Sequence, residues 1–468
     1  MKYKHLVILI IICFVLLLVS CVNPQDTSNG TYDNETSTPD ISGDISDNNS
    51  NERIELVLGG VWIPEDVHFA VATFNRESKT YQIVIYDYEA SGFQDGVQRL
   101  QLELITGKGP DIIYDQYGTL TNTDLLLNLY DFIDMDQDLN RSDFFPNMLK
   151  VLESPSGKLP LIANCFSIFT MIGTKTAVEH IQTWTPSALL SLVEDSNHLI
   201  DPLGPQLTGK VFVMLMLSYA GPEYIDWQNH ESNLNSESFI NLLNASRLLP
   251  EPKSEEDIIS SEPLGDPMVL MAHGKQLLDL TNIGLYSYQI FSDIVGDIVA
   301  LGIPTTTGGA HILEQHWLMG INANTKYADG AWEFLREFLL PTAQLDPWML
   351  FPFPLRIDLY DELITELMIP HMEEDASGNM VEIPWEIELR DENGDIITFN
   401  VYSLTDASAM KMRNIVESAE ILVRRIHRMG LWDLLEGDLD SFFDENRSAE
   451  DTARVMQSRV QIYLSERS

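Results

Sequence analysis

Two histidines and a glutamate lie within six residues of one another and could in principle bind a metal ion. Zinc motifs such as H-E-x-x-H and H-x-x-E-H place their ligands on one face of a helix. The spacing of His311, Glu314 and His316 instead puts the two histidines on different faces. A metal site is therefore not expected here, and the sequence gives no reason to expect any cofactor.

A second cation candidate is the acidic stretch that begins at Asp134 and carries acidic or amide side chains at every other position up to Asn140. A calcium loop of this type requires glycine at its sixth position and glutamate at its twelfth. Leu139 and Phe145 stand at those positions. We therefore interpret the stretch as a solvated acidic turn.

The sequence also lacks the common catalytic signatures. It contains no G-x-S-x-G turn, no phosphate-binding Walker loop and no G-x-G-x-x-G segment. Cys165 could be a nucleophile, but it lies in the apolar stretch 161–166, where a buried and inert thiol is the better interpretation. We expect that the protein is not an enzyme.

Aromatic and polar side chains follow the predicted strands of a parallel sheet. Trp62 comes shortly after the first strand, and Asp115 and Tyr117 follow the third. Ligands of open α/β sheets bind beyond the carboxyl ends of the strands. Aromatic faces stack on C–H groups while polar side chains bind hydroxyls, so these residue types suit a sugar. Core packing is the alternative for each aromatic ring.

The elements that position these residues begin with a β-α-β-α-β pattern. Strands are predicted at 54–58, 81–88 and 111–114, and helices at 64–74 and 97–105, which implies a parallel sheet covered by helices. Further predicted elements are helices at 187–194, 211–219, 239–249, 328–339 and 449–464, a strand at 298–301, and a hairpin that turns at Asn393-Gly394.

The amino terminus has the layout of a secretory signal. Lys2 and Lys4 precede an apolar run from Leu6 to Val19, which at 14 residues is too short to span a bilayer. Residues 18–21, LVSC, resemble the bacterial lipobox. This resemblance implies cleavage after residue 20 and a lipid, including palmitate, on Cys21. Residues 21–52 are then a lipidated, disordered linker, because they are too polar to bury a core.

Composition limits the partners and the fold. Lys and Arg number 28 against 71 Asp and Glu, a net charge of −43, which argues against nucleic-acid binding. The same charge weakly favours neutral or cationic ligands over anions. If residues 1–20 are removed and Cys21 is acylated, Cys165 is the single remaining thiol and no internal disulfide is possible. The length and the 44% hydrophobic content are enough for two lobes.

Four passages resemble the extracellular solute-binding proteins of ABC importers, in the branch that includes maltose-binding protein. They are residues 104–113 (LITGKGPDII), 129–134 (LYDFID), 320–326 (GINANTK) followed by 331–335 (AWEFL), and 453–460 (ARVMQSRV). The resemblance implies an α/β, two-lobed periplasmic-binding-protein fold with a hinge and a central ligand cleft. It also implies a first lobe of 53–165 plus 303–345 and a second lobe of 166–302 plus 346–468.

The resemblance further implies three passages of the chain between the lobes, near 163–167, 302–305 and 341–346. Asn164 would lie at the first passage, Trp348 would follow the third, and Tyr286 and Tyr288 would come from the second lobe. The function implied is that of a monomeric, extracytoplasmic lipoprotein. It would capture a solute, most simply a carbohydrate, by lobe closure and deliver it to permease subunits. The alternatives are a peptide or polyamine binder, a surface sensor without transport, and a surface-anchored hydrolase.

Overall fold

The computed structural model describes most of the chain after residue 52. The described residues are 53–115, 118, 120, 123–154, 156–196, 199, 202–204, 207–220, 223–227, 229–249, 265–341, 352–420 and 425–465. Three of the predicted site residues, Cys21, Tyr117 and Trp348, lie outside them. Residues Arg53–Ser468 form one compact unit, and we describe that unit by itself.

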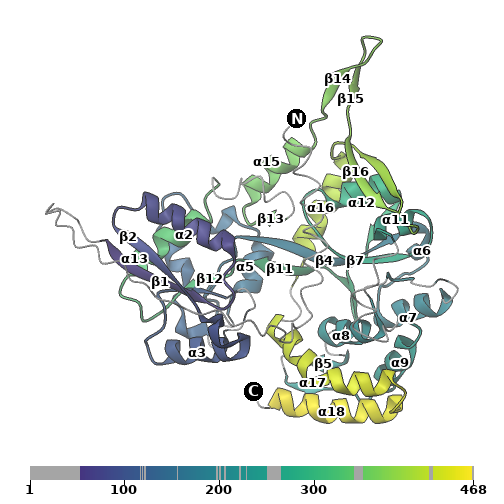
Figure 1. Cartoon of the computed structure of the whole chain (residues 1–468), viewed down its shortest axis with the longest axis horizontal. Helices are drawn as coiled ribbons and strands as arrows, with labels where there is room; N and C mark the ends of the chain where they lie inside the picture. Colours follow the sequence, from purple (N-terminus) through teal and green to yellow (C-terminus); the bar gives the residue numbers. More distant parts are fainter. Residues whose placement is uncertain are drawn as a thin grey trace, which may run out of the picture. The chain divides into compact units, whose positions relative to one another are not determined.

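The first sheet confirms the predicted β-α-β-α-β pattern (Figure 1). Its strands lie in the order β12-β3-β1-β2. β1 pairs in parallel with both β2 and β3, and β12 adds an antiparallel edge from much later in the chain. The strand bounds are β1 Ile54–Gly60, β2 Tyr81–Asp87, β3 Ile112–Tyr114 and β12 Met319–Ile321.

Helices flank this sheet because their apolar residues recur every three or four positions. In α2 the spacing of Val67, Val71 and Phe74 puts all three on the buried side. Phe74 meets Phe334 of α13 edge to face, with ring centroids 5.4 Å apart. The helices are α2 Glu65–Glu77, α3 Phe93–Ile105, α4 Leu129–Ile133, α5 Pro146–Leu152 and α13 Ala328–Glu337; single turns of 3-10 helix are Tyr88–Ser91, Thr123–Leu125 and Arg141–Asp143.

The second sheet is built around one long strand, β4. Every strand that pairs with β4 runs antiparallel to it: β11 and β13 at its start, β7 along its middle and β8 at its end. β4 is buried along nearly its whole length because side chains cover both faces of the sheet. The bounds are β4 Cys165–Thr174, β7 Leu278–Ile283, β8 Ile298–Ala300, β11 Ile312–His316 and β13 Phe353–Pro354.

Strand pairing shows where the chain passes from one sheet to the other. β11 belongs to the second sheet and β12 to the first, so this passage lies at residues 317–318 rather than near 302–305. Residues 303–305 instead form β9, which pairs with β10, residues 308–310, just before β11. The assignment depends on long-range pairing, which local sequence does not reveal. The domain ranges given above remain a prediction, and the passage near 341–346 falls largely outside the described residues.

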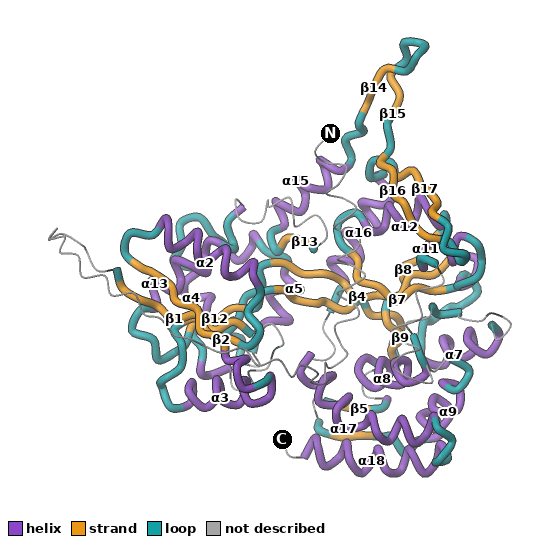
Figure 2. Tube along the Cα trace, in the orientation of Figure 1, coloured by secondary structure: helices purple, strands orange, loops and turns teal. Residues whose placement is uncertain are grey.

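Helices gather around the second sheet and confirm the helices predicted at 187–194, 211–219, 239–249 and 449–464 (Figure 2). Several begin with a side chain that caps them: Thr185, Thr208 and Ser236 accept hydrogen bonds from the first turns of α7, α8 and α9. The bounds are α6 Lys175–Val178, α7 Pro186–Asp195, α8 Gly209–Tyr219, α9 Glu237–Ser246, α11 Pro267–Ala272, α12 Ser287–Val295, α15 Ile357–Leu367, α16 Asp406–Ser418, α17 Arg425–Phe443 and α18 Ala449–Ser465, with the short pair β5 Ile225–Asp226 and β6 Glu231–Ser232. None of the helices in the described ranges is both long and apolar enough to span a membrane.

Two hairpins follow α15. The predicted turn at Asn393-Gly394 is confirmed, and it joins β16, Trp385–Arg390, to β17, Ile396–Val401. The inner face of this hairpin packs on α11 and α12, where Leu389 meets Val269 and Ile294. The other hairpin, β14 Met372–Glu374 with β15 Met380–Glu382, was not predicted; it extends away from the neighbouring helices (Figure 2).

Candidate functional site

The carboxyl ends of the first three strands meet at one edge of the first sheet. Gly60, the last residue of β1, pairs with Asp87 at the end of β2 and with Tyr114 at the end of β3. The chain leaves this edge through Trp62, two residues beyond Gly60, and through Asp115. Trp62 and Asp115 thus both lie beyond the carboxyl ends of their strands, as the sequence predicted. Open α/β sheets bind ligands at this edge.

Asp87 holds two loops at this edge together. Its carboxylate accepts hydrogen bonds from the backbone N–H groups of Trp62 (3.2 Å), Ile63 (2.9 Å) and Glu89 (2.9 Å). Sequence reasoning missed this residue. The available signal was an aspartate that ends an alternating strand, where side chains often bind neighbouring backbone N–H groups.

Trp62 is held in an unusual conformation that presents its ring. Its φ is 57°, in the left-handed region that bulky residues rarely adopt. The ring packs at 38° on Phe93, the first residue of α3, with centroids 4.8 Å apart, yet 41% of the residue stays exposed. A fixed and half-exposed indole is a suitable stacking surface for an apolar ligand face.

Asp115 is buried and holds the loop that follows β3. Its backbone N–H donates to the carbonyl of Leu318 (2.8 Å), and its carboxylate accepts from the N–H of Leu120 (3.1 Å). The carboxylate bond joins Asp115 to Leu120. Direct contact between Asp115 and a ligand remains a prediction.

Asn164 lies on the other side of the segment that follows β11. Its backbone N–H donates to the carbonyl of His316 (3.1 Å), while Ile162 pairs with Met319. The residues around 316–319 thus run between the loop of Asp115 and the chain that enters β4. Two of the predicted site residues, Asp115 and Asn164, are brought to opposite sides of one short segment.

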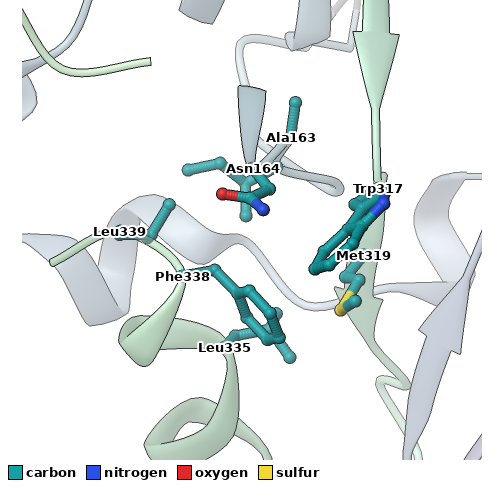
Figure 3. Close-up of a pocket in the computed structure, with 8 residues that line it drawn as sticks. Ala163, Asn164, Trp317, Met319, Leu335, Phe338 and Leu339 are labelled. Carbon is teal, nitrogen blue, oxygen red and sulfur yellow. The ribbon is translucent and has the colours of Figure 1, made fainter. Parts of the chain in front are cut away.

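A small cavity borders Asn164 (Figure 3). Its volume is about 10 Å³, which is room for one water molecule at most. Figure 3 shows the Trp317 ring and Met319 on one side and Phe338 with Leu335 of α13 below. An apolar cavity of this size is a packing gap at the passage between the sheets and cannot hold a sugar.

A polar row on β4 and β11 was also missed by sequence reasoning. Ser167 lies opposite Glu314 in the register of the two strands, and the Ser167 Oγ lies 3.0 Å from Nε2 of His316. Glu314 and His316 are only partly buried, so this row offers a carboxylate and an imidazole to a solute, whereas Ser167 is buried. Alternation along two antiparallel strands could have revealed it, but only once their pairing was known.

The Ser167–His316 pair is a poor nucleophile arrangement. Hydrolases expose their serine at a sharp turn, whereas Ser167 is 8% exposed in the middle of a paired strand. Burial raises the pKa of the Cys165 thiol to about 12, so at neutral pH this sulfur is protonated and unreactive. Within the part of the chain that the structure describes, no three His, Cys, Asp or Glu side chains are grouped to hold a metal ion.

The two tyrosines predicted from the second lobe are packed into the core. The Tyr286 hydroxyl donates to the carbonyl of Tyr402, and the Tyr288 hydroxyl donates to that of Ile298 at 3.1 Å. Burial raises the pKa of Tyr286 above its usual range. The structure does not bring these rings to the edge that carries Trp62, and their contact with a ligand remains a prediction.

Comparison with solved structures places this geometry among known folds. The sugar-binding protein MalE from Xanthomonas citri superposes with a TM-score of 0.55 at 11% identity over 88% of this chain and 98% of its own. An ABC substrate-binding protein from Listeria monocytogenes in complex with cycloalternan gives 0.51 at 13% identity over 88% and 100%. A family 1 extracellular solute-binding protein from Alicyclobacillus acidocaldarius gives 0.51 at 16% over 89% and 100%.

No family model matches this sequence, and neither does any curated protein. The structural likeness nevertheless extends over nearly all of the body after residue 52 and over essentially the whole length of each of these solved chains. At such low identity a likeness of this kind establishes architecture. The chain therefore has the α/β, two-lobed fold of the extracellular solute-binding proteins of ABC importers.

Proposed function

We propose that the protein is a substrate-binding lipoprotein of an ABC import system. It captures an extracellular carbohydrate by closure of its lobes and hands it to permease subunits. Residues 1–20 are its signal peptide and the lipid on Cys21 anchors it outside the cytoplasm. It works as a monomer, without a cofactor and without chemical change to the solute.

The observation that carries this proposal is Trp62, a half-exposed indole held at the carboxyl ends of the strands of the first sheet. A sugar ring has an apolar face of C–H groups and a rim of hydroxyls. The indole suits the face, while partly buried polar side chains such as Glu314 and His316 suit the rim. Two of the similar solved structures support a carbohydrate as the solute: one is in complex with cycloalternan, and the other is named a sugar-binding protein.

A thermal-shift screen of the full-length protein tests the proposal. Candidate sugars, amino acids, peptides and polyamines are added one at a time. A ligand at a hundredfold excess over its dissociation constant stabilises the folded state by about 2.7 kcal/mol, which is a measurable rise in Tm. The proposal expects a rise with a sugar, and a panel in which no sugar raises Tm while another solute does would contradict it.

A matched pair of tryptophan variants links binding to the proposed site. Trp62→Ala removes the indole that packs on Phe93 at 4.8 Å, and Trp385→Ala removes one that packs on Tyr286 at 5.0 Å. Loss of a stacking surface worth about 1.4 to 2.8 kcal/mol weakens sugar binding about 10- to 100-fold. By calorimetry we expect this loss in Trp62→Ala alone, with Trp385→Ala binding as the parent does.

A polyamine is the second candidate solute. The partly buried Glu314 and the net charge of −43 both favour a cation. Salt separates the two candidates, because attraction between a polyamine and a carboxylate weakens as salt is raised, whereas sugar binding changes little. Turnover of model glycosides or esters would instead identify the hydrolase alternative.

A further inference from the structure

The β14–β15 hairpin carries a concentration of exposed apolar side chains. We call residues 369–385, which comprise this hairpin and its two stems, the acidic arm. None of its residues is buried. Its large apolar side chains are all exposed: Ile369, Met372, Met380, Val381, Ile383 and Trp385.

The acidic arm is held in shape by local bonds. The Asp375 carboxylate accepts from the backbone N–H groups of Ser377 (2.8 Å) and Asn379 (2.9 Å), and Gly378 supplies the positive φ of 83° that the turn needs. Pro370 and Pro384 stand at the two stems and restrict the chain there. The surface is therefore preformed, which lowers the entropy cost of binding.

The hairpin buries no apolar side chains of its own that would stabilise this preformed conformation. A two-stranded hairpin on its own is marginal in water, and apolar side chains that stay exposed add nothing to folding. Met372 and Met380 lie on one face of the hairpin, and Val381 lies on the other. Both faces thus offer apolar contact area to something outside this chain.

Charge indicates what that partner is like. The hairpin carries four carboxylates, Glu373, Glu374, Asp375 and Glu382, and no Lys or Arg between residues 371 and 383. A second copy would bring the same negative charge, and an anionic lipid surface would repel it as well. Complementary potential instead requires a positive surface around an apolar centre.

We propose that the acidic arm is a docking surface for another protein, whose contact face has an apolar centre bordered by Lys and Arg. Met372, Met380 and Val381 supply the apolar contact. Glu373 and Glu374, which neighbour them on β14, face the basic border and select the partner. This inference does not depend on which solute the protein binds.

Photo-crosslinking in the cells that make the protein tests the proposal. The photoreactive residue p-benzoylphenylalanine replaces Val381 in the full chain, and a parallel variant carries it at Phe69, an exposed residue of α2. We expect one protein adduct from position 381 alone, and mass spectrometry should place the joined peptide in a segment with a net positive charge. An adduct with the mass of two copies, an adduct with lipid, or none at all would overturn the proposal.

Charge reversal makes the test specific. Glu373→Lys/Glu374→Lys should lower the adduct yield about tenfold, and raising NaCl from about 0.05 to about 0.5 M should do the same. Asp433→Lys/Glu436→Lys changes two exposed carboxylates of α17 and should leave the yield unchanged. Thermal melting checks that each variant is folded. If Glu373→Lys/Glu374→Lys gives the same adduct yield as the parent, the proposal of a basic contact face on the partner is refuted, even though an adduct forms.

Discussion

At the scale of single residues, one carboxylate organises the edge of the first sheet where the carboxyl ends of its parallel strands meet. Asp87 binds backbone N–H groups from the loops after β1 and β2, and in doing so fixes Trp62 in its left-handed conformation. Strained residues persist where surrounding contacts hold them, and they cluster at functional sites. The strain at Trp62 is thus an independent reason to look for a ligand there.

A pair of aspartates should make stability fall as pH rises. Burial raises the pKa of Asp279 on β7 to about 7, helped by the nearby Asp266, whose own pKa burial raises to about 6. A carboxyl with a raised folded-state pKa binds more protons in the native state than in the unfolded state between about pH 4 and pH 7. The native state therefore loses stability through this window.

Asp279→Asn tests this linkage, because the amide resembles the protonated acid. We expect its Tm to exceed that of the parent at pH 8, where the parent carboxyl is charged, and to match it at about pH 5, where the carboxyl is largely protonated. Asp297→Asn, an exposed change on the same part of the chain, is the control. An equal effect of Asp279→Asn at both pH values would contradict the assignment.

How far the site could be predicted depended on what local sequence encodes. Trp62 and Asp115 were predicted to follow the ends of the first and third strands, and they do, because alternation fixes where a strand ends. Ser167 and Glu314 were missed, since their pairing follows from the register between strands, and Asp87 was missed although it ends an alternating strand. Tyr286 was predicted to contact a ligand; its hydroxyl donates to the carbonyl of Tyr402, a pairing that local sequence does not reveal, and the ligand contact remains a prediction.

At the scale of elements, the parallel strands and most helices follow from periodicity because each buries one face. The acidic arm was missed for the opposite reason: its strands bury no residue and so carry no alternation to detect. The chain passes from the second sheet to the first at 317–318, whereas a passage between the lobes was expected near 302–305. A strand's membership of one sheet or the other is decided by distant pairing.

Trp317 lies at this passage, and its backbone conformation predicts an unusual order of stability between its alanine and glycine variants. Its φ is 54°, and its ring meets Phe338, the residue that follows α13, edge to face with ring centroids 5.7 Å apart. Both Trp317→Ala and Trp317→Gly lose that ring contact, but glycine alone removes the left-handed penalty of about 1–2 kcal/mol. We expect the glycine variant to be the more stable of the two in urea unfolding, the reverse of the order found in ordinary strands and helices. Alanine equal to or above glycine would show that the backbone relaxes.

At the scale of the whole molecule, the residues that stabilise the folded body are different from the residue that is proposed to anchor it to the membrane. The largest hydrophobic cluster runs from Leu56 of the first sheet through Phe166 and Ile168 of β4 to Met412 of α16. Asn147 of α5 adds hydrogen bonds to the carbonyls of Val416 and Ala419, at 2.8 and 3.0 Å. This cluster thus joins the two sheets, while the proposed anchor depends on one residue outside it.

Cys21→Ser tests the anchor. If Cys21 carries the lipid, this change abolishes incorporation of labelled palmitate and moves the protein from the membrane fraction to the medium or periplasm, because acyl chains contribute about 0.8 kcal/mol per buried CH₂. Cys165→Ser is the matched control; its thiol is buried, and its palmitate labelling should stay unchanged. Continued labelling of Cys21→Ser would contradict the proposed site of attachment.

If the lobes close around a solute, the radius of gyration of the protein should decrease. Closure of two lobes around a solute draws mass toward the centre, so the radius of gyration of the released Cys21→Ser chain should decrease when a bound sugar is added, as measured by small-angle X-ray scattering. Trp62→Ala in the same background should show no decrease at a sugar concentration that saturates the parent alone. If saturating sugar raises Tm while the radius stays constant, the solute binds without closure, and delivery by a closed form is refuted while solute binding itself stands.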